Sequence, residues 1–217
     1  MRKYIYSIFL LGLFSCQEEG VVQYTQEKDG LQFSANSSED MTKVFNFATA
    51  TYEEEINGEP KTFYYGDSLA AYTFERVVLD LQGFPTPDER EYKLKTVLVE
   101  DQDSSKVAEV VFEPYYSLAP NQLKDTIKIT VLRPKTRGTY TVGITVDTEG
   151  KGAFFDKGVV EKSILRLDIK DVYEQPEGWD ERQEWLGEFD EEKYAFMVTV
   201  SKQAFSKQNN HLRNEPD

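Results

Sequence analysis

The stretch Phe74-Glu75-Arg76-Val77-Val78-Leu79-Asp80-Leu81 contains the clearest strand pattern in the chain. Val77, Leu79 and Leu81 occupy every second position, and a period of two directs alternate side chains to one face of a β-strand. One face of this strand is therefore expected to lie on an apolar core. Gly83-Phe84-Pro85 follows, and glycine with proline is typical of the end of a strand.

Similar runs of β-prone residues occur on both sides of this stretch. They are rich in Val, Ile, Thr, Tyr and Phe, and turn residues separate them. The expected strands cover residues 31–34, 44–51, 62–65, 92–99, 107–112, 127–132, 140–146 and 163–169. Asn57-Gly58 is a favoured hairpin centre. Because no helical pattern intervenes, the runs predict a mainly β chain with an antiparallel immunoglobulin-like β-sandwich over residues 30–172.

The pattern changes after residue 172, and a helical segment with a polar tail is expected over residues 173–217. Asp180 is expected to cap a short helix that ends near Gly187, because an aspartate can accept hydrogen bonds from the first free N–H groups of a helix. Asp190 is expected to cap a second helix for the same reason. The second helix has one moderately apolar stripe, formed by Tyr194, Met197, Val198, Ser201 and Phe205.

The N-terminus has the layout of a secretory signal. Arg2 and Lys3 precede an apolar run from Ile5 to Phe14, which is the order found in signal peptides. The run is roughly half as long as the ~20 residues that a membrane-spanning helix needs. Residues 1–15 are therefore predicted to be a cleaved lipoprotein signal peptide.

Cys16 is the only cysteine of the chain, and it follows Leu13-Phe14-Ser15. These four residues resemble a bacterial lipoprotein box, in which the cysteine becomes the lipid-modified N-terminus. A single thiol in a secreted protein has no partner for a disulfide, and acyl chains attached to it would anchor the chain to a membrane. An ordinary signal peptide with a chance cysteine is the alternative.

An acidic tether over residues 16–29 is expected after the signal. Gln17-Glu18-Glu19 resembles the acidic export tag of surface lipoproteins in Bacteroidota. With Glu18 and Glu19 as the export signal, the chain is expected on the outward face of the outer membrane. A solvated acidic linker without an export role is the alternative.

The composition suits a folded, acidic protein. Hydrophobic residues make up 39% of the 217 residues and aromatic residues 13%, which is enough for a core and argues against global disorder. The formal net charge is −14. No nucleic-acid partner is expected, because phosphate binding needs clustered Lys and Arg.

Five segments occur in an order that resembles a known family. They are Val77–Pro85, Asp88–Arg90, Asp125–Arg133, Lys170–Trp179 and Leu186–Lys193. Together with the lipoprotein signal they resemble the Bacteroidota lipoproteins defined as domain of unknown function 4843. The resemblance implies a β-sandwich lipoprotein, often encoded near starch-utilisation-type outer-membrane transporters. It implies no catalytic residues.

The sequence offers no catalytic set. His211 is the sole histidine and lies in the polar tail, where no third group would hold it in place as a base. Cys16 is assigned to the lipid anchor. Carboxylates are abundant, but abundance alone does not indicate the paired acids of a glycosidase. No catalytic residue and no cofactor are predicted.

Asp101 and Asp103 are the candidate metal ligands. They lie with Glu100 in a loop after an expected strand, and clustered carboxylate oxygens suit calcium. The glycine and terminal glutamate of a twelve-residue calcium loop are missing. A solvated loop without a metal is the alternative.

Aromatic residues are the candidates for ligand binding, because sugar C–H faces pack on aromatic rings. The candidates are Tyr115-Tyr116, Phe154-Phe155, Trp179 and Trp185. Tyr115 and Tyr116 are the first choice, since they precede Pro120 in an expected loop. Packing in the core is the alternative for every one of these rings.

These features predict a non-enzymatic, surface-exposed outer-membrane lipoprotein that acts as an accessory or binding subunit of a glycan or nutrient-uptake system. The expected partners are the membrane through the N-terminal lipid anchor, a starch-utilisation-type transporter complex and a glycan. The alternative is a structural or adhesive interaction module with no small-molecule ligand.

Overall fold

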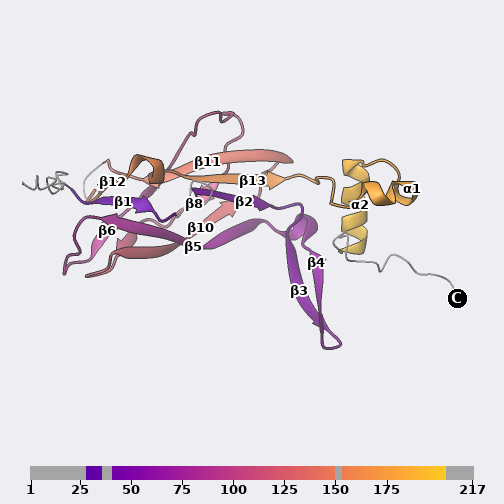
Figure 1. Ribbon diagram of the computed structural model, residues 1–217, viewed down its shortest axis with the longest axis horizontal. Helices are drawn as coiled ribbons and strands as arrows, with labels where there is room; N and C mark the ends of the chain where they lie inside the picture. Colours follow the sequence, from indigo (N-terminus) through magenta and orange to yellow (C-terminus); the bar gives the residue numbers. More distant parts are fainter. Residues whose placement is uncertain (1–27, 36–40, 150–152, 204–217) are drawn as a thin grey trace, which may run out of the picture.

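The computed structural model describes residues 28–35, 41–149 and 153–203. The predicted lipidation site Cys16, the export residues Glu18 and Glu19, and His211 lie outside the described residues. The described chain is mainly β and forms two main sheets and two two-stranded sheets. Figure 1 shows an elongated molecule with the C-terminal helices at one end.

The larger sheet has five strands in the order β12-β1-β5-β10-β8. In chain order these are β1 (Gly30–Phe33), β5 (Ala71–Gln82), β8 (Val110–Val111), β10 (Lys124–Leu132) and β12 (Asp156–Lys157). The stretch Phe74–Leu81 thus lies in the longest strand, β5, at the centre of this sheet. Its neighbours β1 and β10 both run antiparallel to it.

The smaller sheet has four strands in the order β2-β13-β11-β7. They are β2 (Thr42–Asn46), β7 (Leu94–Val97), β11 (Gly138–Val146) and β13 (Leu165–Asp171). β2 runs parallel to β13, and in the larger sheet β1 runs parallel to β12. The expectation of an entirely antiparallel arrangement is wrong for these two pairs. Neither pair is joined by a hairpin turn, so packing on the core sets the strand direction.

One cluster of buried side chains takes residues from both main sheets. Val77, Leu79 and Leu81 are buried in it, as the period of two predicts. The cluster also includes Ile127, Ile129 and Val131 from β10, Val142, Ile144 and Val146 from β11, and Leu165, Leu167 and Ile169 from β13. The burial of alternate residues explains why these strands could be recognised from the sequence.

The strand expected at residues 92–99 is divided between two sheets. β6 (Arg90–Tyr92) pairs with β9 (Tyr116–Leu118), whereas β7 pairs with β11. The chain changes sheet at Lys93, whose carbonyl accepts a hydrogen bond from the Asp147 N–H at 2.8 Å. The prediction of one continuous strand is therefore wrong, because apolar residues on both sides of Lys93 hide the break.

The hairpin expected around Asn57-Gly58 is confirmed. β3 (Thr51–Ile56) and β4 (Glu59–Tyr64) form a separate two-stranded sheet. Asn57 and Gly58 have φ angles of 57° and 81°, and a tight hairpin turn with two positive φ angles favours Asn-Gly. In Figure 1 the hairpin projects away from the main sheets.

Short helices follow β13, as expected. They are the 3-10 helix η4 (Asp180–Arg182), α1 (Gln183–Leu186) and α2 (Glu191–Ser201). Asp190 caps α2, as its Oδ1 accepts from the Lys193 N–H at 2.8 Å. The prediction that Asp180 caps the first helix is wrong. Trp179 occupies the cap position of η4, and the Asp180 carboxylate instead accepts a hydrogen bond from the Gln175 amide at 2.8 Å.

A second, smaller cluster joins the hairpin to the helices. Its buried members are Ala48, Tyr64, Tyr173, Trp179, Tyr194 and Val198. We call the residues that form this region, 48–70 and 172–203, the end module, and the remaining described residues the body. The end module lies opposite the end of the body that contains β6 and β12 (Figure 1). In the part of the chain that the structure describes, no helix has the length and apolar character needed to cross a membrane.

Candidate functional site

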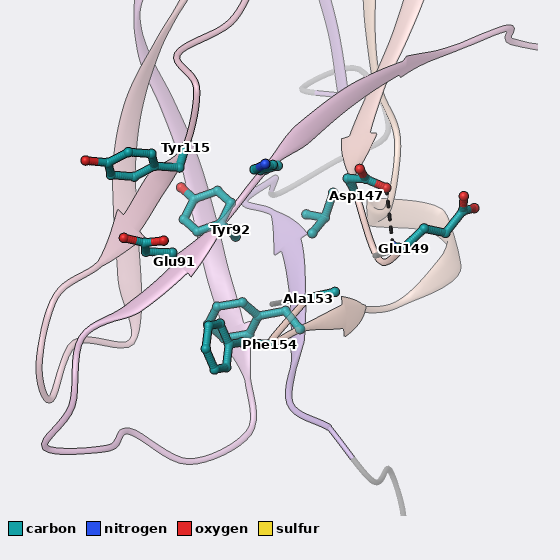
Figure 2. Close-up of a pocket in the computed structure, with 10 residues that line it drawn as sticks. Glu91, Tyr92, Tyr115, Asp147, Glu149, Ala153 and Phe154 are labelled. Atoms are coloured by element: carbon teal, nitrogen blue, oxygen red, sulfur yellow. Dashed lines mark hydrogen bonds between the residues drawn. The ribbon is translucent and has the colours of Figure 1, made fainter. Parts of the chain in front are cut away.

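A cavity of about 340 Å³ lies at the end of the body opposite the end module. It is lined by residues of β6, of the segment before β9, of the end of β11 and of the segment before β12. Glu91, Lys93, Tyr115, Asp147, Glu149 and Phe154 are among these residues. We call it the β6–β12 cavity. Figure 2 shows Tyr115 and Glu91 on one side, Asp147 and Glu149 on the other, and Phe154 below.

Two exposed aromatic rings line this cavity. Tyr115 is 56% exposed and Phe154 is 53% exposed. Each precedes a buried aromatic residue, since Tyr116 is only 8% exposed and Phe155 only 1%. Because successive side chains of an extended chain point to opposite sides, each aromatic pair has one ring in the core and one toward solvent. Of the two first-choice residues for ligand binding, Tyr116 is therefore a core residue, and Tyr115 is the one that faces solvent.

The buried aromatic rings form a fixed support beneath the cavity. Tyr92 stacks on Tyr116 with ring centroids 5.6 Å apart and meets the edge of Phe155 at 6.2 Å. The Tyr92 hydroxyl donates to Asp125 Oδ2 at 2.6 Å. Burial, and then this hydrogen bond, raises the pKa of Tyr92, so its hydroxyl stays protonated and keeps donating.

Arg90 adds a cationic contact under the same rings. Its guanidinium carbon lies 4.7 Å from the centre of the Phe155 ring, and its Nη1 donates to Asp29 Oδ2 at 2.6 Å. Asp29 belongs to the segment that enters β1, so this ion pair connects β6 to the first described residues. The cavity therefore has a preformed floor.

Charged groups of both signs surround the cavity. Lys95 lies beside it and bonds Asp147 at 2.9 Å and Glu149 at 3.0 Å. The hydrogen bond from Lys95 lowers the pKa of the Asp147 carboxyl, which is therefore ionised at neutral pH. Glu91 contributes a further carboxylate and Lys93 an amine to the lining. Such groups can accept hydrogen bonds from hydroxyls or donate to them.

The loop of the candidate metal ligands is closed by its own hydrogen bonds. Asp103 Oδ1 accepts from the Ser105 N–H at 2.9 Å and from the Ser105 hydroxyl at 2.7 Å, which lowers the pKa of Asp103. Asp101 has a φ of 63°, a turn conformation that aspartate tolerates. Within residues 28–35, 41–149 and 153–203, no three His, Cys, Asp or Glu side chains are grouped to hold a metal ion.

The two tryptophans lie away from the β6–β12 cavity. Trp179 is buried in the end module, and its Nε1 donates to the Gly187 carbonyl at 3.1 Å. It is a core residue rather than part of a binding platform. Trp185 is 88% exposed on α1.

The sequence identified the aromatic part of this site but not its charged part. The aromatic doublets at residues 115–116 and 154–155 are among the sequence candidates, and the structure brings Tyr115 of the first and both phenylalanines of the second into the lining of the same cavity. Glu91, Lys93, Asp147 and Glu149 were not predicted. They come from segments more than fifty residues apart in the sequence, and charged residues at strand ends are too common to be a signal.

Comparison with known proteins gives one family and several distant structures. A family model described as Domain of unknown function (DUF4843) matches residues 67–203. The apo form of the Calx CBD1 domain is similar at 12% identity and a TM-score of 0.38, over 67% of this chain and 98% of that domain. No curated protein matches.

Two similar structures come from Bacteroides. EndoBT-3987 of Bacteroides thetaiotamicron with Man5GlcNAc product has 10% identity and a TM-score of 0.38, over 65% of this chain and 30% of that one. The GH5 xyloglucanase of Bacteroides ovatus in complex with a XXXG heptasaccharide has 13% identity and a TM-score of 0.31, over 69% of this chain and 22% of that one.

Proposed function

We propose that this chain, which belongs to the domain-of-unknown-function family DUF4843, is a non-enzymatic surface lipoprotein that binds a glycan for a nutrient-uptake system. The observation that supports glycan binding is the pair of exposed rings, Tyr115 and Phe154, in one cavity with carboxylates. Ring faces pack on the C–H faces of a sugar, and carboxylates accept hydrogen bonds from its hydroxyls. The volume of about 340 Å³ is at the small end of ligand pockets.

The order of strands supports an immunoglobulin-like sandwich as the scaffold. The neighbours β1-β5-β10-β8 follow the A-B-E-D order of one immunoglobulin sheet, and β13-β11-β7 follow the G-F-C order of the other. β2 adds an outer strand beside β13. The β3–β4 hairpin and the C-terminal helices are additions at one end of this scaffold.

The proposed lipid anchor at Cys16 joins the body near the β6–β12 cavity. Lys28, in the predicted tether, donates from Nζ to the carbonyl of the cavity residue Ala153 at 3.0 Å. The twelve residue steps from Cys16 to Lys28 span at most about 40 Å when extended. A glycan in the cavity would therefore be held close to the outer membrane, where a starch-utilisation-type transporter could take it up.

A structural or adhesive module without a small-molecule ligand is the second candidate. The observation that favours it is the apolar surface of the end module, where Trp185, Phe196 and Val200 are exposed. Exposed apolar residues of this size are typical of contact surfaces when they gather in one region.

A glycan array followed by calorimetry tests the binding proposal. We expect Tyr115→Ala and Phe154→Ala each to weaken binding of an array hit by about tenfold, with an unchanged thermal midpoint. Phe196→Ala is the matched control, because Phe196 is a comparably exposed ring on α2. If a variant with both substitutions, Tyr115→Ala and Phe154→Ala, bound the glycan as tightly as the wild-type chain, the cavity would be rejected as the binding site.

Membrane fractionation of cells tests the anchor. The Cys16→Ala variant should lose its lipid and appear in the soluble fraction, and protease added to intact cells should degrade the wild-type chain. Retention of the variant in the membrane with unchanged mobility would contradict lipidation at Cys16.

A further inference from the structure

The edge of the smaller sheet that is formed by β2 is open. β2 is its end strand, and on its inner side the Phe47 N–H donates to the Lys170 carbonyl at 2.8 Å. The backbone groups of successive residues in a strand point alternately to its two edges. The backbone N–H and C=O groups of Phe45 therefore also point to β13, whereas those of Val44 and Asn46 point to the open side. No described strand pairs with them there.

A groove of about 470 Å³ runs beside this open edge. Val44, Phe45 and Asn46 of β2 line one side, together with Tyr72 of β5, which stacks on Phe45, and Tyr65 and Leu69 line the other side. Figure 1 shows β2 leading toward the base of the β3–β4 hairpin, and Tyr65 directly follows the end of β4. The groove is therefore bounded by the body on one side and by the end module on the other.

The walls of the groove are aromatic and preformed. Phe45 stacks on Tyr72 with ring centroids 3.6 Å apart, and Tyr65 packs on Tyr52 at 4.8 Å. Val44 is nevertheless 58% exposed, so apolar surface remains available beside the open backbone groups.

The groove differs from the rest of the surface in charge. None of the residues that line it is charged, although the chain has a net charge of −14. A neutral or basic ligand would avoid repulsion by the surrounding acidic surface.

We propose that the groove binds an extended, apolar segment of a partner protein, which adds to β2 as a new strand. Such a segment would pair its backbone with Val44 and Asn46 and place every second side chain against the aromatic walls. An unpaired strand edge next to an apolar groove matches both features of a peptide strand. A sugar would use the rings but has no regular series of groups for the strand edge. A second copy of this chain is disfavoured by mutual repulsion of its acidic surface. This inference does not depend on the β6–β12 cavity.

Peptide selection tests the proposal. Random octapeptides displayed on phage would be selected on the immobilised full chain, and the best one synthesised. We expect apolar or β-branched residues at alternate positions and no acidic residues. Val44→Pro removes an outward N–H but no hydrogen bond to β13, and proline is tolerated at such edge positions. It should weaken binding about tenfold or more, whereas Val44→Thr keeps the N–H and should bind normally.

A second measurement keeps the test valid if Val44→Pro is unstable. The synthetic peptide methylated on alternate backbone nitrogens should lose binding to the wild-type chain in one register and keep it in the other. The proposal would be overturned if the two methylated peptides bound the wild-type chain with equal affinity. It would also be overturned if the selected peptide bound Val44→Pro as tightly as the wild-type chain.

Three other results would also overturn it. The first is that no peptide is selected. The second is a neutral glycan whose binding is lost in Tyr65→Ala but kept in Val44→Pro, which would make the groove a carbohydrate site. The third is self-association in sedimentation that Val44→Pro abolishes, which would identify the occupant as a second copy. Tyr115→Ala should leave peptide binding unchanged and so separates this groove from the glycan proposal.

Discussion

The body and the end module are held together in different ways. The body has a continuous cluster of mostly aliphatic side chains from two sheets, and such packing is strong but without direction. The cluster of the end module contains the rings of Tyr64, Tyr173, Trp179 and Tyr194. The hydroxyls of Tyr64 and Tyr194 lie 3.3 Å apart, and burial with this contact raises the pKa of Tyr194. The end module therefore depends on a few directional contacts.

A buried ion pair lies where the two regions meet. Arg133, after β10, donates to both oxygens of Asp171, from Nε at 2.9 Å and from Nη2 at 2.7 Å. Its Nη1 also donates to the Gly66 carbonyl in the end module at 2.8 Å. The Arg137 guanidinium lies 4.6 Å above the Tyr173 ring. The two regions are thus joined by a buried ion pair and a cation–π contact, in addition to apolar contacts such as that of Leu69 with the body core.

Breaking this ion pair should have the largest effect. Asp171→Ala leaves the Arg133 charge buried without its main partner, and we expect a loss of about 4 kcal/mol in the free energy of unfolding. Urea denaturation would measure it. The control is Asp67→Ala, since Asp67 also bonds Arg133 but is 68% exposed, and its loss should cost less than about 1 kcal/mol. Equal effects of both variants would mean that the pair does not act as a buried junction.

Truncation in each core should separate the two regions. Leu79→Ala in the body and Trp179→Ala in the end module should each cost about 3 kcal/mol. Hydrogen exchange should then show faster exchange throughout the chain for Leu79→Ala, but only in the hairpin and helices for Trp179→Ala. Loss of protection in β5 and β10 of the Trp179 variant would show instead that the two cores unfold as one unit.

Removing a helix cap should have a smaller effect, confined to the end module. Asp190→Ala takes away the acceptor for the Lys193 N–H, and we expect a loss of about 1 kcal/mol, measured by urea denaturation. Asp180→Ala is the matched control, because Asp180 is not a cap and should change stability by less than about 0.5 kcal/mol. A larger loss for Asp180 than for Asp190 would contradict the assignment of the caps.

The smallest effect is expected at the opposite end of the body. Lys95→Met removes the hydrogen bond that lowers the pKa of Asp147, so this pKa should rise toward its ordinary value of about 3.9. A carboxyl with a lowered folded pKa stabilises the fold above its unfolded pKa, and the contribution is lost as the pH falls through the folded value. Carbon NMR titration of Asp147 measures the shift. No change in the variant would show that Lys95 does not hold this carboxylate in solution.

Much of the fold was predictable because burial alternates along single strands. Val77, Leu79 and Leu81, the Asn57-Gly58 turn and the Asp190 cap were all expected and are confirmed. Each depends on residues within a few positions of one another. The break at Lys93 was missed, since the partner that marks it, Asp147, is distant in the sequence.

The candidate site was only partly predictable for the same reason. Aromatic doublets are visible in the sequence, but which ring of each faces solvent depends on the direction in which the chain meets the core. Tyr116 is buried because it stacks on Tyr92, a contact with a separate strand. The charged lining of the β6–β12 cavity follows from the meeting of four segments.

The sequence by itself determined the strands with alternating apolar residues, the tight hairpin, the cap of α2 and the membership of the family. These features depend on local periodicity and short-range hydrogen bonds. Only the tertiary structure decided that β2 has an open edge, that the hairpin and the C-terminal helices share one core, and that Tyr115 and Phe154 line one cavity. Each of these depends on contacts between segments far apart in the chain, whose pairing is set by packing of the whole fold.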